Sequence, residues 1–121
     1  MRIKIITPKR IKNKFTKEAI KEYSKRLTRY CKLQLNVTNK VTQEIKNNSY
    51  LIKISCNGEM LTSEELAEKI SSLGVIGNSH ITFVFDDEHH VENVDFTIKI
   101  SNMNIDSDLS LIILYEQIYR A

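Results

Sequence analysis

The last stretch of the chain, Leu109–Ala121, constrains the fold most strongly. It reads LSLIILYEQIYRA and leaves almost no polar face when it is wound as a helix. A helix that is apolar nearly all round is buried on several sides, inside a fold or between subunits. The end of a chain frays unless it docks. We therefore expect this helix to be buried twice, against the chain's own sheet and against a partner subunit.

Length and composition predict one globular domain, residues 1–121. The chain is 41% hydrophobic and holds three Gly and one Pro, which leaves little room for linkers. Its longest apolar run, Leu111–Tyr115, is too short to span a bilayer. The N-terminus, MRIKIITPKR, is too short and too charged for a signal peptide. Cys31 and Cys56 lack metal-ligand spacing, and we interpret them as buried reduced thiols rather than a disulfide. This pattern favours a cytoplasmic protein with no membrane contact.

The net charge of +3 conceals an uneven distribution along the chain. Residues 1–40 carry 13 of the 18 Lys and Arg and two acids, whereas residues 41–121 carry five bases and 13 acids. A basic half joined to an acidic half suggests an anionic partner that is engaged from one side. The alternative is a lysine-rich helix that is simply solvated. The candidate phosphate-binding residues form a basic loop followed by a helical stripe: Lys9, Arg10, Lys12, Lys14, Lys17, Lys21 and Lys25.

Hydrophobic periodicity predicts five strands. Alternating, β-branched stretches lie at Arg2–Thr7, Lys32–Val37, Tyr50–Cys56 and Phe96–Ser101. The fifth, Ile81–Phe85, is a continuous apolar run, as expected for a strand buried on both faces.

Helices are predicted between several of these strands. One begins at Thr16, and another is capped by Thr62, with Glu65 completing a capping box, and ends before Gly74. A weak helical pattern covers Val41–Ile45. This order predicts an α/β fold, a small, mostly parallel open sheet flanked by helices, with one helix at the C-terminus.

Three stretches of the sequence resemble one known family. They are Ala19–Leu27 (AIKEYSKRL) with Tyr30 and Lys32, Gly58–Glu64 (GEMLTSE) with Leu66 and Ala67, and Glu116–Ala121 (EQIYRA). In this order they resemble the ribosomal large-subunit pseudouridine N3-methyltransferases of the SPOUT superfamily. The resemblance implies a trefoil-knotted α/β fold, a homodimer, S-adenosylmethionine as methyl donor and a ribosomal RNA substrate. We place the interface of that dimer on the terminal helix, because its apolar surface exceeds what one small sheet can cover. The interface residues are Leu109, Ile112, Ile113, Tyr115, Glu116 and Tyr119.

The departures from the family fall in the cofactor pocket. The resemblance places that pocket at Ile54, Gly58, Asp86, Asp87, Ser101, Met103 and Ile105. A Gly-Gly turn of the family is Asp86-Asp87 here, where side chains and negative charge replace bare backbone. The family's Phe-Pro-His knot segment aligns with Ile105–Leu111 and keeps none of those residues, and the family's terminal tail has no counterpart after Ala121. The family's helix that follows this turn is expected to be shortened here, to Glu88–Asp95. We therefore expect no S-adenosylmethionine binding and assign no catalytic residue.

A metal site is the other chemistry that the sequence suggests. Asp86–His90 (DDEHH) combines carboxylates and imidazoles, but five consecutive residues cannot all point at one ion. We favour a solvated acidic loop and assign no metal ligand. Three hypotheses remain open: a degenerate, RNA-binding or dimeric scaffold without methyl transfer, which we favour; an active S-adenosylmethionine-dependent ribosomal RNA methyltransferase with an unusual pocket; and a metal-dependent hydrolase built on the acidic loop.

Overall fold

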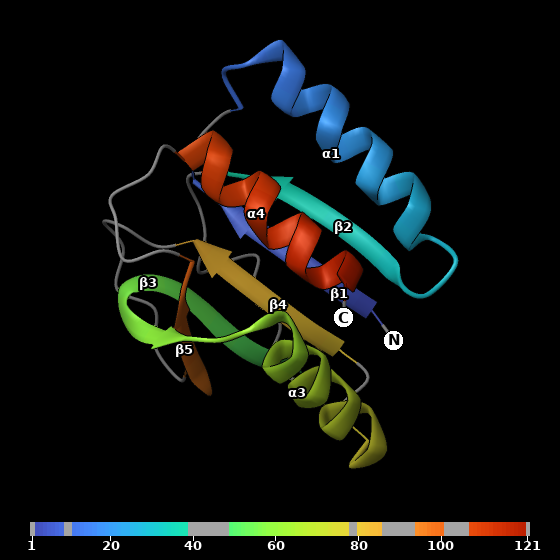
Figure 1. Cartoon of the computed structure of the whole chain (residues 1–121), viewed down its shortest axis with the longest axis vertical. Coiled ribbons are helices and arrows are strands. Elements are labelled where there is room, and N and C mark those ends of the chain that lie inside the picture. The colour runs from blue at the N-terminus through green and yellow to red at the C-terminus, as the bar shows by residue number, and fades with distance from the viewer. Residues whose placement is uncertain are drawn as a thin grey trace.

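A computed structural model describes residues 2–8, 11–38, 49–77, 80–85, 94–100 and 107–120. Within these residues the chain forms one sheet and three helices, whose arrangement is drawn in Figure 1. In chain order the elements are β1 (Arg2–Thr7), α1 (Lys14–Leu27), β2 (Lys32–Val37), β3 (Tyr50–Met60), α3 (Ser63–Val75), β4 (His80–Phe85), β5 (Phe96–Lys99) and α4 (Ser107–Arg120).

The sheet is parallel throughout its five strands, in the order β2-β1-β4-β3-β5. The expected α/β class with a mostly parallel sheet is confirmed. Central strand β4 is buried over Ile81–Val84, which agrees with its continuous apolar sequence. All strands run in one direction, so their carboxyl ends gather at one edge of the sheet and their amino ends at the other.

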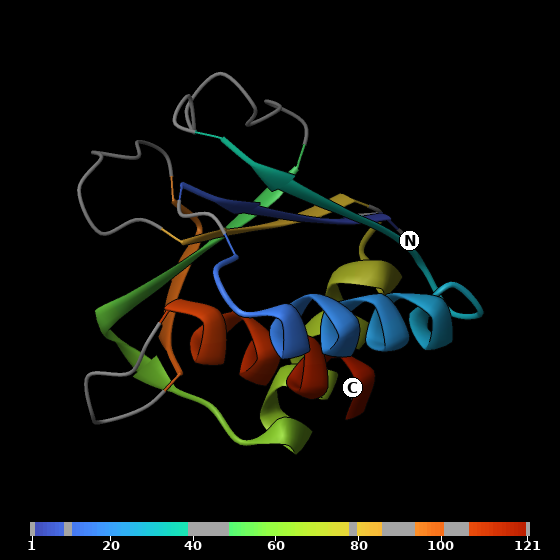
Figure 2. The same ribbon diagram turned by 90° about the horizontal axis from the view of Figure 1, so that it is seen from above.

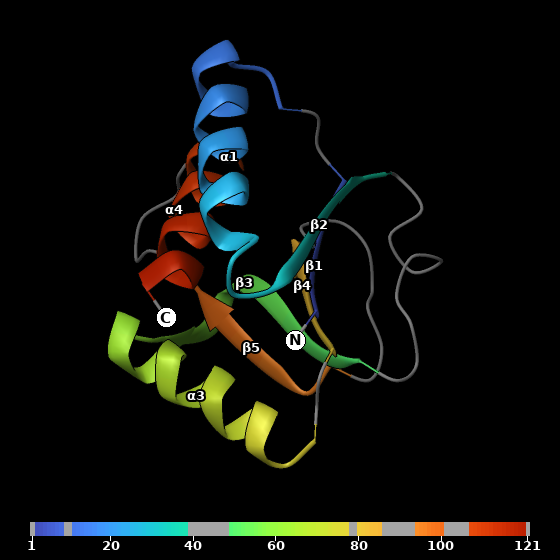
Figure 3. The same ribbon diagram turned by 90° about the vertical axis from the view of Figure 1, so that its right-hand side faces the viewer.

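The three helices cover the same face of the sheet (Figure 2). Helix α4 lies between α1 and α3 and packs against both (Figure 3). The main core joins this helical layer to the strand residues that point toward it, such as Ile5 and Phe83 from the sheet and Leu114 from α4. The opposite face holds a smaller cluster of Ile6, Leu51 and Val84.

Capping explains where two of the helices begin. Helix α1 starts two residues before Thr16, because the Asn13 side chain accepts a hydrogen bond from the Phe15 amide at 2.8 Å. The predicted capping box of α3 is confirmed, since the Thr62 hydroxyl accepts from the Glu65 amide at 3.1 Å and the Glu65 carboxylate accepts from the Thr62 amide at 3.0 Å.

The predicted end of α3 at Gly74 is wrong. The helix continues through Gly74 to Val75, and the residue with positive φ is Gly77, at 92°. The Gly77 amide donates to the Gly74 carbonyl oxygen at 3.2 Å. Gly77 therefore reverses the chain in the left-handed region that favours glycine.

Strand β3 extends four residues beyond its predicted end at Cys56, and it is irregular in its second half. Its register against β5 shifts between Ile54 and Glu59, both of which pair with Ile98. Gly58 lies within this irregularity, and an ideal Cβ on Gly58 would stand 2.5 Å from the Ile98 carbonyl carbon. Only glycine fits here, because the backbone of β5 fills the space that a side chain would need.

Asp95 anchors the start of β5 instead of ending a helix. Its carboxylate accepts from the Leu51 amide at 2.8 Å, and its own amide donates to the Leu51 carbonyl oxygen at 2.9 Å. The rest of the helix expected at Glu88–Asp95 lies outside the described residues apart from Val94, as does all of the weak helix at Val41–Ile45. The knot segment expected at Ile105–Leu111 is described only from Ser107, where α4 begins, and the trefoil knot remains a prediction.

Candidate functional site

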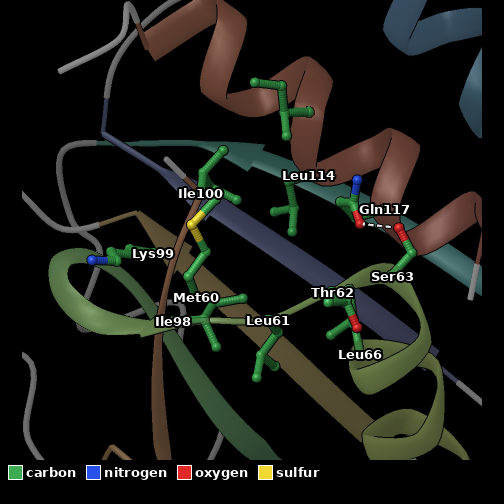
Figure 4. Close-up of a pocket in the computed structure, with 11 residues that line it drawn as sticks. Met60, Leu61, Thr62, Ser63, Leu66, Ile98, Lys99, Ile100, Leu114 and Gln117 are labelled. Atoms are coloured by element: carbon green, nitrogen blue, oxygen red, sulfur yellow. Dashed lines mark hydrogen bonds between the residues drawn. The ribbon is translucent and has the colours of Figure 1, made fainter. Parts of the chain in front are cut away.

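A small cavity lies at the carboxyl edge of the sheet, between the ends of β3 and β5 and the helices α3 and α4 (Figure 4). Its volume is about 200 Å³. Apolar side chains form most of its lining, including Leu61, Ile98 and Leu114. Across one side, the Ser63 hydroxyl donates to the side-chain amide oxygen of Gln117 at 2.6 Å and so links α3 to α4. Ligands of open α/β sheets bind at this edge, which makes the cavity the candidate cofactor site.

The described lining of this cavity fits S-adenosylmethionine poorly. Ligand pockets commonly measure roughly 300–1,000 Å³ and place polar groups where the ligand is polar. This cavity is smaller, and Lys99 is the one charged residue in its described lining. Two of its polar side chains, Ser63 and Gln117, are engaged with each other. Little remains to receive the ribose and the charged ends of the methyl donor.

Two of the seven family cofactor positions fall within the described residues, and both are closed against strands. Ile54 is buried and pairs with Phe85 on one side and Ile98 on the other. Gly58 is covered by the backbone of Ile98. The remaining five positions, Asp86, Asp87, Ser101, Met103 and Ile105, lie outside the described residues.

The predicted basic stripe lies on the outward face of α1. Lys17, Lys21 and Lys25 are exposed, whereas Ile20 and Leu27 on the opposite side of the helix are buried. Two further candidate residues are also exposed: Lys12, which precedes α1, and Lys14, the first residue of α1. Lys9 and Arg10 lie outside the described residues.

The ion pair on α1 lies beside the basic stripe, toward α4. The Arg26 guanidinium is 3.4 Å from the Glu22 carboxylate and stacks over the Tyr119 ring at 5.9 Å. The stripe of Lys17, Lys21 and Lys25 therefore presents positive charge to solvent, in an arrangement suited to phosphate.

Helix α4 divides its apolar residues between two sides. Leu111, Leu114 and Ile118 are buried against the sheet and the neighbouring helices. Leu109 is 46% exposed on the outward side. Tyr119 is 40% exposed and lies toward α1, where its ring contacts that of Tyr23 and the guanidinium of Arg26. Predicted interface residues Ile112, Ile113 and Glu116 are partly exposed.

The prediction that Tyr115 lies at the dimer interface is wrong. Its side chain is 1% exposed and belongs to the protomer's own core. Burial raises the pKa of its phenol, and a hydrogen bond with the Ser24 side chain opposes part of that rise.

Neither a metal site nor a membrane span is found within the part of the chain that the structure describes. No group of three or more His, Cys, Asp and Glu could hold a metal there, and no helix is long and apolar enough to cross a bilayer. The Asp86–His90 segment lies outside those residues. Cys31 is half-buried rather than fully buried, and burial raises the pKa of its thiol.

Sequence reasoning missed the two contacts that shape the cavity, Gly58 against Ile98 and Ser63 with Gln117. Each contact joins residues at least 40 positions apart in the sequence. Local sequence patterns cannot predict contacts between residues so far apart in the chain. The one available signal was the glycine itself, because glycine inside a strand often marks a bulge or a close backbone approach.

Comparison with known proteins identifies relatives along the whole chain. The family model described as "Predicted SPOUT methyltransferase" matches residues 1–121. Proteins named ribosomal RNA large subunit methyltransferase H are similar: those of Acetivibrio thermocellus and Bifidobacterium adolescentis are 35% identical and that of Clostridium novyi is 36% identical. Each alignment covers 100% of this chain and 93% of the relative.

The alignments also show that this chain is short for its family. Each spans 148 positions, which is more than the 121 residues of this chain, so the relatives contain residues that it lacks. The match nevertheless runs from the first residue to the last. The chain therefore belongs to the SPOUT methyltransferase family, as a shortened and divergent relative of ribosomal RNA large subunit methyltransferase H.

Proposed function

We propose that this protein is a dimeric, RNA-binding member of its family that has lost methyl transfer. The observation that carries the proposal is the small size and mostly apolar lining of the cavity at the carboxyl edge of the sheet. Gly58 packs on the backbone of Ile98, and the neighbouring cavity has a volume of about 200 Å³. Methyl transfer of this kind requires the donor to be held and oriented, because the protein contributes chiefly positioning and electrostatics.

The sequence after β4 supports the same proposal. Asp86-Asp87 follows Phe85, the last residue of β4, and aligns with the Gly-Gly turn that the family resemblance assigns to the cofactor pocket. Two carboxylates there repel the carboxylate of S-adenosylmethionine, although they attract its sulfonium. Repulsion at one end of the ligand and a small cavity beside it act in the same direction, against binding.

The outward stripe of α1 supports RNA binding. Lys17, Lys21 and Lys25 repeat every four residues and therefore lie along one side of the helix. Their exposed ammonium groups can neutralise several phosphates of one strand, which releases counterions and makes affinity depend on salt. The relatives are named as ribosomal RNA methyltransferases, so large-subunit ribosomal RNA is the first substrate class to test.

The outward side of α4 supports a homodimer. Leu109 is exposed at its start, and Ile112 and Ile113 lie partly exposed after it. A run of apolar side chains on one helix is typical of a surface that a second subunit covers. A two-fold dimer places the same surface of both copies in contact.

Calorimetric titration with S-adenosylmethionine tests the loss of methyl transfer. We expect no saturable heat, while ribosomal RNA large subunit methyltransferase H of Acetivibrio thermocellus serves as the positive control in the same buffer. Saturable binding together with methylation of large-subunit ribosomal RNA would establish the alternative, an active enzyme with an unusual pocket. Family membership along the whole chain is the observation that favours this alternative.

RNA binding is tested separately with the double variant Lys17→Glu/Lys21→Glu. We expect its affinity for large-subunit ribosomal RNA to fall and the slope of log affinity against log salt to decrease by about 1.4–1.8, the value for two lost phosphate contacts. The matched control is Lys69→Glu/Lys99→Glu, which makes the same charge change on α3 and β5. Equal losses of affinity in both variants would assign the effect to net charge. The stripe on α1 would then be a solvated helix face that does not bind RNA.

A further inference from the structure

Three basic residues stand side by side at the amino edge of the sheet. Arg2, at the start of β1, is in register with Lys32 of β2 and with His80 of β4. Neighbouring strands lie about 4.8 Å apart, so the three residues span roughly 10 Å. Side chains in register on parallel strands point to the same face. Ile3, the next residue after Arg2, points into the helical core, so this row lies on the sheet face opposite the three described helices.

This row borders a cavity of about 370 Å³. Lys4 and Gln34, one pleat further along β1 and β2, contribute to the lining, as do Ser49 and Thr82. The Thr82 side chain is 2% exposed, and its hydroxyl donates to the Ser49 hydroxyl oxygen at 3.0 Å. The cavity therefore has polar walls, and its volume falls within the range of about 300–1,000 Å³ typical of small-ligand sites.

The charge of this cavity is of one sign. Its charged or titratable lining residues in the described part of the chain are Arg2, Lys4, Lys32 and His80. The three strands that carry them, RIKIIT, KLQLNV and HITFVF, contain no Asp or Glu. A ligand that enters this cavity meets cationic donors on adjacent strands and no acidic side chain from those strands.

We propose that this cavity binds the phosphate group of a nucleotide, either free or within an RNA strand. The Arg2 guanidinium can bind two phosphate oxygens at once, and the Lys32 ammonium supplies a second cation. The His80 imidazole carries a ring N–H that can donate to a third oxygen in either protonation state. A cavity of this volume has room for the sugar or base beside the phosphate.

This site is distinct from the cofactor edge. It lies at the amino ends of β1, β2 and β4, whereas the 200 Å³ cavity lies at the carboxyl ends of β3 and β5. It also lies on the opposite face from the helices. The proposal therefore stands on its own, whether or not the protein binds S-adenosylmethionine and whether or not the stripe on α1 binds RNA.

Two titrations of the full chain at low salt test the site. The first uses adenosine monophosphate, with adenosine as the control that lacks phosphate, followed by amide chemical shifts. The second uses a fluorescein-labelled oligouridylate of 12 nucleotides, followed by anisotropy. The test variant is Arg2→Gln/Lys32→Gln, in which both altered side chains are exposed. The control is Arg26→Gln/Lys69→Gln, which removes the same charge from α1 and α3 at two residues outside both this cavity and the stripe of lysines on α1. His80→Gln provides a second variant if thermal melting shows the double variant to be unfolded.

A free nucleotide is the ligand if the protein binds adenosine monophosphate but not adenosine. Its affinity must also be at least tenfold weaker in the test variant and unchanged in the control. Binding of the oligonucleotide alone, at least fivefold weaker in the test variant, supports the site with RNA as its ligand. The proposal is overturned if neither ligand loses affinity in folded Arg2→Gln/Lys32→Gln or His80→Gln, or if the control Arg26→Gln/Lys69→Gln loses as much.

Discussion

Replacing Gly58 with alanine tests the close contact between β3 and β5 beside the candidate cofactor cavity. The new methyl carbon would begin 2.5 Å from the carbonyl carbon of Ile98 and 2.7 Å from its nitrogen and Cα. Ordinary contact between carbon atoms needs about 3.5 Å or more, so β3 and β5 must separate by roughly 1 Å. These atoms belong to backbone, and no side chain can rotate away to make room.

The cost follows from two effects. Forcing an extra methyl group into a packed site costs about 1–3 kcal/mol, and weakening a backbone hydrogen bond between the strands costs about 1 kcal/mol more. We therefore expect Gly58→Ala to lower the free energy of unfolding by about 2–4 kcal/mol. For a chain of this size that corresponds to a fall in Tm of roughly 8–16 °C.

The assay combines thermal melting with hydrogen exchange, at one protein concentration because a dimer's Tm depends on it. The matched control is Gly77→Ala, where the added Cβ meets nothing within 4 Å and the cost is the strain of a positive φ, about 1–2 kcal/mol. Exchange should accelerate across Phe96–Lys99 in Gly58→Ala and stay unchanged there in Gly77→Ala. If Gly58→Ala is as stable as the parent protein, or if β5 keeps its protection, Ile98 does not press on Gly58.

Three further predictions concern α4. Leu109→Lys should shift the protein from dimer to monomer in light scattering, because it places a charge on the outward apolar side, while leaving circular dichroism unchanged; a persistent dimer would move the interface elsewhere. Tyr115 holds its phenolic proton to a higher pH than in the unfolded chain, so the free energy of unfolding should fall as pH rises past 10, and Tyr115→Phe should remove that fall in urea titrations. A parallel decline in both proteins would mean that another group titrates. Gln117→Leu removes the 2.6 Å hydrogen bond with Ser63 and should lower the free energy of unfolding by about 1 kcal/mol in the same titrations. An unchanged free energy of unfolding would mean that water binds the Ser63 hydroxyl equally well.

Local patterns were sufficient to predict most of the fold. The alternation in Arg2–Thr7 and Lys32–Val37 predicted the strands to the residue, and Thr62 with Glu65 predicted the start of α3. Such signals succeed because side-chain periodicity and capping act over a few residues. The predicted end of α3 is wrong because an isolated glycine such as Gly74 is tolerated within a helix, and Gly77 follows three residues later with a positive φ.

The site was harder to predict, since it depends on which sides of elements meet. An apolar terminal helix gave no means of separating Tyr115, which is buried in the protomer, from Tyr119, which is exposed. The row of Arg2, Lys32 and His80 was equally invisible, because each residue begins a different strand and only the order of the sheet brings them together.

The central place of α4 in the helical layer has a consequence for the order of folding. Helices α1 and α3 each pack against α4, and the core residues Leu114 and Ile118 lie between them. A nascent chain in which β1 to β5 have been synthesised but residues 107–120 have not therefore lacks the central helix of the helical layer. The hydrophobic residues that α4 covers are then exposed. Contacts between α1 and α4 join residues some 90 positions apart, and contacts of such long range are slow to form. Until they do, Ile5 and Phe83 remain uncovered, and the half-made protein is at its most prone to aggregation.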